Sequence, residues 1–411
     1  MRRTLERGHF PVSGVARGEV VVPSVFTHPI RGEVRCPAAP VAVPPGTPVR
    51  HAPVRPGGDA VLHTVSYVDP SGAVVGLAVA AHRDDAHAQR LAETSVTAWA
   101  AVMRTRRVLL EATGPSCAGL RHEAAMIARA GGPVAVLAPA TARRDVSSRW
   151  PWRGIRLVER PADVPAGTTL VLPAHGSAAP ATEVRAAAAR GVRVVDATCP
   201  LVARAHATAR RFAGEGAQVV VIAGAGDAAA PPLARQAPNA AVVTSGADVD
   251  SLVVEGPARV AFVVSPGLPA EDAGVLATRL RRRFTGTIGQ HPDELCYAAS
   301  DRRAAVRAVA ASSELTLVLG DPAAADTRLL TATAAGGHRV EWLAELGGLR
   351  PEWLAQTNSV GILVAASARP ALAGELIEVL SGLGPLSVAR RTVTTTVDHA
   401  KPLLVKAKRA G

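Results

Sequence analysis

The sequence predicts an α/β protein of several small units. From residue 106 onward, apolar runs of strand length alternate with Ala- and Arg-rich amphipathic segments. The chain is 48% hydrophobic but only 3% aromatic, a composition typical of Val/Leu strands packed under Ala-rich helices. At 411 residues it exceeds the usual size of one core, so we expect more than one domain.

Residues 1–105 differ from the rest of the chain in their pattern of prolines and apolar runs, and this pattern predicts a small α+β extension. Prolines cluster between residues 37 and 56, which favours a loop or extended segment. Two apolar runs, 60–68 and 73–79, flank Asp69-Pro70-Ser71-Gly72 and predict a β-hairpin. A helix is expected over 85–104. The extension carries no recognisable chemistry, and the sequence leaves open whether it covers the site, binds substrate or mediates dimerisation.

The remaining chain predicts ten strands in three successive groups. We expect three αβ units, 106–205, 206–290 and 291–395, followed by a basic C-terminal tail, 396–411. Amphipathic helices between strands include 182–190, 272–283 and 302–311. The expected strands are 108–112, 134–138, 169–173, 193–197, 218–223, 241–244, 259–264, 315–320, 340–343 and 360–365.

The charge balance favours an anionic partner. Lys and Arg outnumber Asp and Glu by 46 to 34, a net charge of +12 that suits nucleic acid, a phosphorylated ligand or an acidic electron-transfer protein. No nucleic-acid motif or basic-aromatic cluster accompanies the charge, so we expect no nucleic-acid partner. No apolar run approaches the length of a membrane span, and no hydrophobic stretch follows the N-terminal arginines, so we expect a cytoplasmic protein.

Three of the four cysteines stand alone at predicted strand ends or turns. Cys199 lies at the exit of a hydrophobic strand, where a following helix N-terminus stabilises a thiolate. Cys117 and Cys296 stand in similar settings, separated from Cys199 by about one unit length each. We therefore expect three loops to bring these thiols to one site. Cys36, in a Pro-rich segment, is interpreted as a buried filler.

The spacing of these three cysteines in the sequence disfavours two common kinds of cysteine site. Structural zinc sites and disulfide relays usually use close pairs such as C-x-x-C, and no such pair is present. Three single cysteines can instead hold three corners of an iron–sulfur cluster and leave a fourth iron without a protein ligand. An iron left open in this way binds substrate oxygen and delivers electrons to it.

Four short motifs surround these cysteines: Cys117-Ala118-Gly119, Ala174-His175-Gly176, Asp196-Ala197-Thr198-Cys199-Pro200-Leu201-Val202 and Cys296-Tyr297-Ala298-Ala299-Ser300-Asp301-Arg302. Over about residues 106–395 they resemble the LytB/IspH family, 4-hydroxy-3-methylbut-2-enyl diphosphate reductase. The resemblance implies a trefoil of three αβ units around a central 4Fe-4S cluster, and the two-electron reductive removal of an allylic hydroxyl in the non-mevalonate pathway of isoprenoid biosynthesis.

Carried over by position, the resemblance implies that Cys117, Cys199 and Cys296 are the cluster ligands. It implies that His175 contacts the substrate diphosphate and that Ser367 belongs to the same pocket.

The chain departs from the family at several pocket positions. At the family's His-Pro-Glu segment the proton-delivering glutamate is replaced by Ala229, and Asp227 stands at the histidine position as a candidate acid or as a loop-capping aspartate. The Thr-Gln-Thr-Thr stretch is replaced by 264–267, the Ser-Ser-Asn cluster by 323–328, and the first family histidine is absent from 137–144. Losing these donors weakens diphosphate binding by several kcal/mol, at roughly 1 to 3 per charged hydrogen bond.

Three functional interpretations follow. The first is a cluster-dependent reductase that removes a hydroxyl from a different or larger allylic alcohol. The second is the family's own reaction, with Asp227 and arginines such as Arg143, Arg144 or Arg328 replacing lost contacts. The third is a non-catalytic iron–sulfur electron carrier or redox sensor. In each case an acidic electron donor such as ferredoxin or flavodoxin suits the positive charge.

Overall fold

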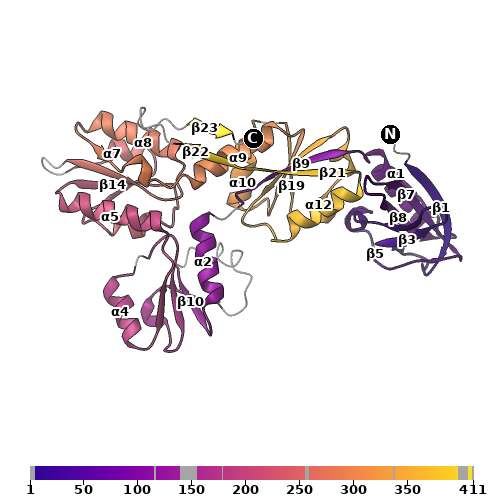
Figure 1. Cartoon of the computed structure of the whole chain (residues 1–411), viewed down its shortest axis with the longest axis horizontal. Helices are drawn as coiled ribbons and strands as arrows, with labels where there is room; N and C mark the ends of the chain where they lie inside the picture. Colours follow the sequence, from indigo (N-terminus) through magenta and orange to yellow (C-terminus); the bar gives the residue numbers. More distant parts are fainter. Residues whose placement is uncertain are drawn as a thin grey trace. The chain divides into compact units, whose positions relative to one another are not determined.

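The computed structural model describes residues 5–114, 117–138, 155–177, 179–254, 259–336, 338–396 and 406–409 (Figure 1). The chain divides into two units. One comprises Met1–Ala112 with Val306–Arg391, and the other Thr113–Ala305 with Thr392–Gly411. Each unit is described by itself.

The N-terminal extension forms an eight-stranded sheet with the order β3-β4-β8-β7-β1-β6, to which β2 and β5 add at the side of β8. The predicted hairpin is present as the antiparallel pair β7 (Ala60–Val68) and β8 (Val74–His82). The predicted helix is α1, Ala86–Ala101. The other strands are β1 (Glu6–Ser13), β2 (Val20–Val21), β3 (Val25–His28), β4 (Gly32–Arg35), β5 (Val49–Arg50) and β6 (Arg55–Pro56).

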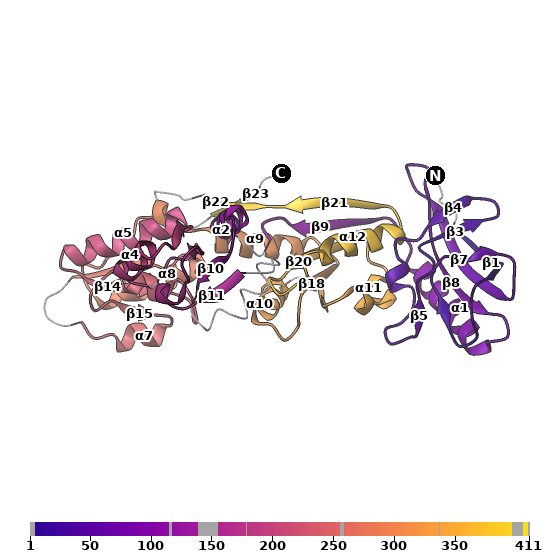
Figure 2. The same cartoon turned by 90° about the horizontal axis from the view of Figure 1, so that it is seen from below.

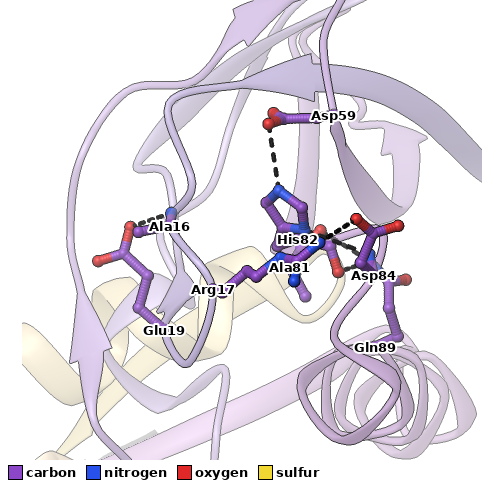
Figure 3. Close-up of polar contacts among 8 residues, drawn as sticks. All are labelled: Ala16, Arg17, Glu19, Asp59, Ala81, His82, Asp84 and Gln89. Atoms are coloured by element: carbon purple, nitrogen blue, oxygen red, sulfur yellow. Dashed lines mark hydrogen bonds and ion pairs between the residues drawn. The ribbon is translucent and has the colours of Figure 1, made fainter.

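A polar network joins the end of β8 to the start of α1 (Figure 3). His82 Nδ1 accepts a hydrogen bond from the Asp84 backbone N–H at 3.2 Å, so Nε2 carries the proton that faces the Asp59 carboxylate at 3.1 Å. Gln89 in the first turn of α1 donates to the carbonyl of Ala81 at 2.7 Å. Arg17 pairs with Asp84. These contacts fix the helix against the strand that precedes it.

The first αβ sheet is parallel, with the order β11-β10-β12-β13. Alternate residues of its strands face opposite sides: Val134 and Val136 pack with Ile127 of α2, whereas Ala135 and Leu137 pack on the side of α4. Figure 1 shows the two helices on either side of the strands. The elements are α2 (Ala118–Arg129), β10 (Val134–Leu137), β11 (Ile155–Val158), β12 (Thr169–Leu172), α4 (Ala181–Ala189) and β13 (Arg193–Asp196).

The second αβ sheet, also parallel, has the order β15-β14-β16-β17. Its two faces are covered by different helices, α5 and α6 on one and α7 and α8 on the other. Phe262 is buried on the α8 face. The elements are α5 (Pro200–Gly214), β14 (Gln218–Ile222), α6 (Ala230–Ala234), β15 (Ala241–Val243), α7 (Gly246–Ser251), β16 (Val260–Val264), α8 (Ala270–Arg283) and β17 (Ile288–Gly289).

The third αβ sheet corrects the expected grouping of strands. Its order is β19-β18-β20-β9-β21, so β9 (Arg106–Glu111), which we placed in the first group, pairs in parallel with β20 and β21 instead. Figure 2 shows β9 and β21 running side by side. Such an apolar run marks a buried parallel strand without specifying its neighbours. The other elements are α9 (Ala298–Ala311), β18 (Leu315–Leu319), α10 (Ala325–Ala334), β19 (Arg339–Leu343), α11 (Pro351–Leu354), β20 (Ser359–Val364), α12 (Leu372–Gly382) and β21 (Leu386–Arg391).

The N-terminal extension and the third sheet share one hydrophobic core. Buried residues of β8 and α1 belong to the same cluster as Val108 of β9, Leu317 of β18 and Leu376 of α12. Tyr67 Oη donates to the carbonyl of Ser381 at 2.7 Å, which ties the extension to α12. The extension is therefore packed as part of the unit that contains the third sheet.

Arg106 is buried within this unit, and no carboxylate among the described residues pairs with it. Only 2% of the residue is exposed, and its guanidinium donates to the carbonyls of Val102, Arg104, Leu354, Thr357 and Leu383. Burial lowers the pKa of Arg106 to about 10, with repulsion from Arg104 as a second cause. The side chain thus joins the end of α1 to the loops beside α11 and α12.

All ten expected strands are present, most of them within a residue or two of the predicted bounds. Strands that were not predicted are β1 to β6 of the extension, then β11, β17 and β21, and a final antiparallel pair, β22 (Val393–Thr396) with β23 (Lys406–Arg409). Among the described residues, no helix combines the length and hydropathy needed to cross a membrane. Short 3-10 helices complete the chain at Ala39–Val41, Pro161–Asp163, Pro292–Glu294 and Leu346–Gly348.

Candidate metal centre

Each of the three single cysteines stands at the start of a helix. Cys117 is the N-cap residue of α2, Cys199 is the N-cap residue of α5, and Cys296 lies two residues before α9. These helices pack on the first, second and third sheets respectively. The N-terminal end of a helix carries partial positive charge and stabilises a thiolate. All three thiols therefore stand at helix starts, and each of the three helices packs on a different sheet.

The structure brings the three cysteines to one cavity. Its volume is about 390 Å³, and Cys117, Cys199 and Cys296 all line it. Gly119, in the first turn of α2, allows two of the sulfurs to approach. A Cβ at this residue would lie 3.0 Å from Cys199 Sγ and 3.7 Å from Cys117 Sγ. Only glycine leaves room for Cys199 at this point.

The thiol of Cys296 is held in its protonated form by its surroundings. Burial raises its pKa above the ordinary value, while a backbone hydrogen bond from Ala298 opposes the rise. Proximity to Cys117, Cys199 and Asp301 raises the pKa further. A metal that takes this sulfur as thiolate must therefore displace a proton, which couples metal binding to pH.

The donor set of this cavity consists of three thiols. Within the described part of the chain, no group of three or more His, Cys, Asp or Glu side chains is arranged to hold a single ion. The three thiols instead surround a cavity from three helix starts. Thiolates are the protein ligands of iron–sulfur clusters, in which each sulfur binds a different iron. The residues present fit such a group.

His175 lies in the same cavity, on the loop that follows β12. The preceding residue, Ala174, is held on both sides: its N–H donates to the Glu123 carboxylate of α2 at 3.2 Å, and its carbonyl accepts from the Cys199 N–H at 3.0 Å. The structure thus places this predicted substrate residue beside the cysteines and attaches its loop to the helices of two of them.

Three charged residues that the sequence interpretation did not assign also line the cavity. They are Arg121 of α2 and the neighbouring Asp301 and Arg302 of α9. Asp301 Oδ1 accepts a hydrogen bond from the Thr395 backbone N–H of β22 at 2.6 Å. Asp301 and Arg302 belong to the Cys296 motif, five and six residues after the cysteine, and that spacing was the available signal for them.

Asp227, which by sequence is either a candidate acid or a loop-capping aspartate, is not among the residues that line this cavity. Its Oδ1 accepts a hydrogen bond from the backbone N–H of Ala229 at 2.9 Å, the geometry of an aspartate that closes a turn. Pro266 and Gly267, from the segment that replaces the family's Thr-Gln-Thr-Thr stretch, do line it. That part of the wall offers no side-chain donor, which agrees with the expected loss of polar contacts.

Ser367 lies in the other unit, after β20. Its hydroxyl is 3.0 Å from the Thr327 hydroxyl, and its backbone N–H donates to the Asp326 carboxylate at 3.0 Å. Gly320, with φ of +146°, permits this arrangement, since a Cβ there would lie 2.7 Å from Thr327 Oγ1. One hydroxyl, that of Thr327, therefore persists in the segment that replaces the family's Ser-Ser-Asn cluster, beside the Asp326 carboxylate.

Of the three arginines suggested as replacements for lost diphosphate contacts, the structure describes one, Arg328. Arg143 and Arg144 lie outside the described residues. Arg328, near the start of α10, donates to the backbone carbonyl of Ala323. Cys36 is buried in the core of the extension, where burial raises its pKa to about 12, as suits a structural thiol.

Comparison with known proteins gives a consistent result. Residues 108–381 match the family model described as LytB protein. The chain is 33% identical to 4-hydroxy-3-methylbut-2-enyl diphosphate reductase of Burkholderia pseudomallei over 289 residues, 69% of this chain and 92% of the relative. It is also 33% identical to reductase 1 of Mycobacterium tuberculosis over 314 residues, 73% of this chain and 94% of that protein.

Solved structures support the fold. The corresponding reductase of Plasmodium falciparum superposes with a TM-score of 0.55 at 20% identity, covering 70% of this chain and 92% of the other. A second structure, titled as the terminal enzyme of the non-mevalonate pathway, gives a TM-score of 0.53 at 19% identity, covering 67% and 99%. The resemblance inferred from the cysteine motifs is confirmed, and the chain belongs to the LytB protein family.

Proposed function

We propose that the chain reduces (E)-4-hydroxy-3-methylbut-2-enyl diphosphate to isopentenyl and dimethylallyl diphosphate, with a 4Fe-4S cluster held by Cys117, Cys199 and Cys296. The observation that carries this proposal is the single cavity lined by these three thiols and His175. The relatives that match most of their own length are named for this reaction. The alternative interpretation from the sequence thus becomes the main one.

A different or larger substrate, our first expectation, finds no support in these relatives. That expectation depended on lost polar contacts at 264–267 and 323–328. The cavity nevertheless retains the imidazole of His175 as a polar group, and Arg121 and Arg302 supply positive charge suited to an anionic substrate. Loss of individual hydroxyl donors is therefore compatible with retention of a diphosphate substrate.

The reaction consumes two electrons and two protons: the allylic C–O bond breaks, a C–H bond forms, and the hydroxyl leaves as water. The cluster, when bound, supplies the electrons and a Lewis-acidic iron for the substrate oxygen. The chain's own groups bind and orient the diphosphate through His175 and the two arginines. Among the described residues that line the cavity, His175 and Asp301 are the side chains with a carboxyl or imidazole suited to proton transfer.

The electrons come from a low-potential one-electron donor. An acidic ferredoxin or flavodoxin fits the net charge of +12. We further propose that the three αβ sheets are the three parts of a trefoil around the cluster, with the N-terminal extension as an addition to the third part. The shared core of extension and third sheet supports this assignment.

Complementation tests the function. Expression of this chain in a bacterial strain that depends on the reductase for growth is expected to restore growth, and the Cys199→Ser variant is expected not to. Failure of the wild-type chain, expressed together with a ferredoxin and shown to contain its cluster, would contradict the proposal.

A further inference from the structure

The loop that carries His175 is held from two directions by side chains with no assigned role. Glu123 of α2 accepts the N–H of Ala174, and His206 of α5 packs against Gly176. These contacts lie immediately before and after His175. We infer that Glu123 and His206 are positioning residues that set the place of His175 in the cysteine cavity. The substrate role of His175 rests on the proposed function.

The contact of Glu123 is buried at both ends. Glu123 is 2% exposed and Ala174 is 1% exposed. Breaking this hydrogen bond leaves a buried backbone N–H without its acceptor, and the protein is then destabilised by the full free energy of desolvating that group. Glu123 is six residues after Cys117 on the same helix. The bond therefore fixes the loop relative to the helix that begins at a cluster ligand.

The opposite side of the same peptide is fixed by Cys199. The carbonyl of Ala174 accepts the N–H of Cys199 at 3.0 Å. Ala174 thus bridges two helices that begin with thiols, and a change at Glu123 is transmitted to the residue next to His175. A loop stabilised only by its own turn would not have this connection.

The contact of His206 fixes the residue after His175. Gly176 has φ of +85°, and a Cβ there would lie 2.7 Å from Cε1 of the His206 ring. Within the part of the chain that the structure describes, the buried His206 Nε2 has no hydrogen-bond partner. The ring therefore acts on the loop by its shape, as a flat surface on which the Gly176 backbone rests.

The experiment measures loop order and diphosphate binding in the cluster-loaded protein. Hydrogen exchange of residues 173–177 reports the loop, and calorimetry with inorganic diphosphate reports the anion site. Glu123→Leu removes the acceptor, Glu123→Gln keeps an oxygen in place, and His122→Leu alters an exposed neighbour on the same helix as a control. His206→Ala tests the contact with Gly176, and it replaces Glu123→Leu as the test of the loop if that variant does not fold.

We expect Glu123→Leu to speed exchange of 173–177 and to weaken diphosphate binding about tenfold, as loss of one charged hydrogen bond does. Glu123→Gln and His122→Leu are expected to match the wild type. The double variant Glu123→Leu/His175→Ala should bind no more weakly than His175→Ala alone. Cluster absorbance and iron content should stay unchanged in all of them.

Unchanged exchange in both Glu123→Leu and His206→Ala would overturn the inference. If the loss of diphosphate affinity in the double variant equalled the product of the two single-variant losses, Glu123 would act independently of His175, and the link between them would be overturned. Normal diphosphate binding by His175→Ala would instead refute the substrate role of His175, whereas faster exchange in Glu123→Leu would still support the hold of Glu123 on the loop.

Discussion

Gly119 lies so close to Cys199 that a Cβ at residue 119 would stand 2.9 Å from the Cys199 Cβ. The glycine belongs to the first turn of the helix that begins at Cys117. Its missing side chain therefore sets the separation of two predicted cluster ligands.

Gly119→Ala is expected to force the two thiols apart. Overpacking of this kind costs about 1 to 3 kcal/mol, and here the strain falls on the cluster ligands. We expect lower iron and sulfide content per chain, measured after anaerobic reconstitution. Gly131→Ala, where a new Cβ meets nothing within 4 Å, is the matched control and should bind a full cluster.

Each of the three single cysteines is expected to be required for the cluster. Changing Cys117, Cys199 or Cys296 to Ser replaces a soft thiolate by a poor iron ligand, so iron content and visible absorbance should fall sharply. Cys36→Ser should retain the cluster, because Cys36 is buried in the core of the other unit. A variant of Cys296 with full iron content would contradict the ligand set.

Asp301→Asn is expected to lower kcat, whereas Asp227→Asn is expected to leave it unchanged. Asp301 lines the cysteine cavity, while Asp227 closes a turn outside it. Loss of a general acid typically lowers the rate by a factor of about 100 or more. Steady-state turnover of both variants at equal cluster content makes the comparison, and the reverse pattern would restore Asp227 as the acid.

Arg106→Leu is expected to destabilise the unit that contains the extension. The change removes the guanidinium donor from five backbone carbonyls, of which only those of Leu354 and Leu383 also accept a backbone N–H among the described residues, at a cost of at least about 3 kcal/mol. Denaturant unfolding measures it, with the exposed neighbour Arg107→Leu as control. Because the folded pKa of Arg106 is about 10 and the unfolded value is higher, both states are protonated below pH 9, and the loss should be the same from pH 6 to 9.

The strands were predictable because their apolar runs are local signals. Val108 and its neighbours mark a buried strand from sequence alone, yet their pairing with β20 and β21 depends on residues some 250 positions later. The extension's hairpin was readable from the turn at Asp69, but its shared core with Leu317 and Leu376 was not. Pairing partners and packed faces are properties of the assembled chain.

In the candidate site, too, residues in short local motifs were predictable from the sequence, whereas contacts between distant segments were not. Cys117, Cys199, Cys296 and His175 were identified from short motifs, and they meet in one cavity. Glu123 was not identified, because its role depends on a backbone N–H from another segment. Two interpretations of Asp227, an acid or a loop-capping aspartate, were left open by its position in a motif, and its contact with the Ala229 N–H agrees with the second.

Anaerobic turnover tests the proposed reaction of the cysteine cavity. The cluster-loaded chain is mixed with (E)-4-hydroxy-3-methylbut-2-enyl diphosphate and a low-potential reductant, and the products are separated and quantified. We expect isopentenyl and dimethylallyl diphosphate from the wild type and neither product from Cys296→Ser. A protein with a complete 4Fe-4S cluster, verified by Mössbauer spectroscopy, that forms neither product would contradict the proposed reaction.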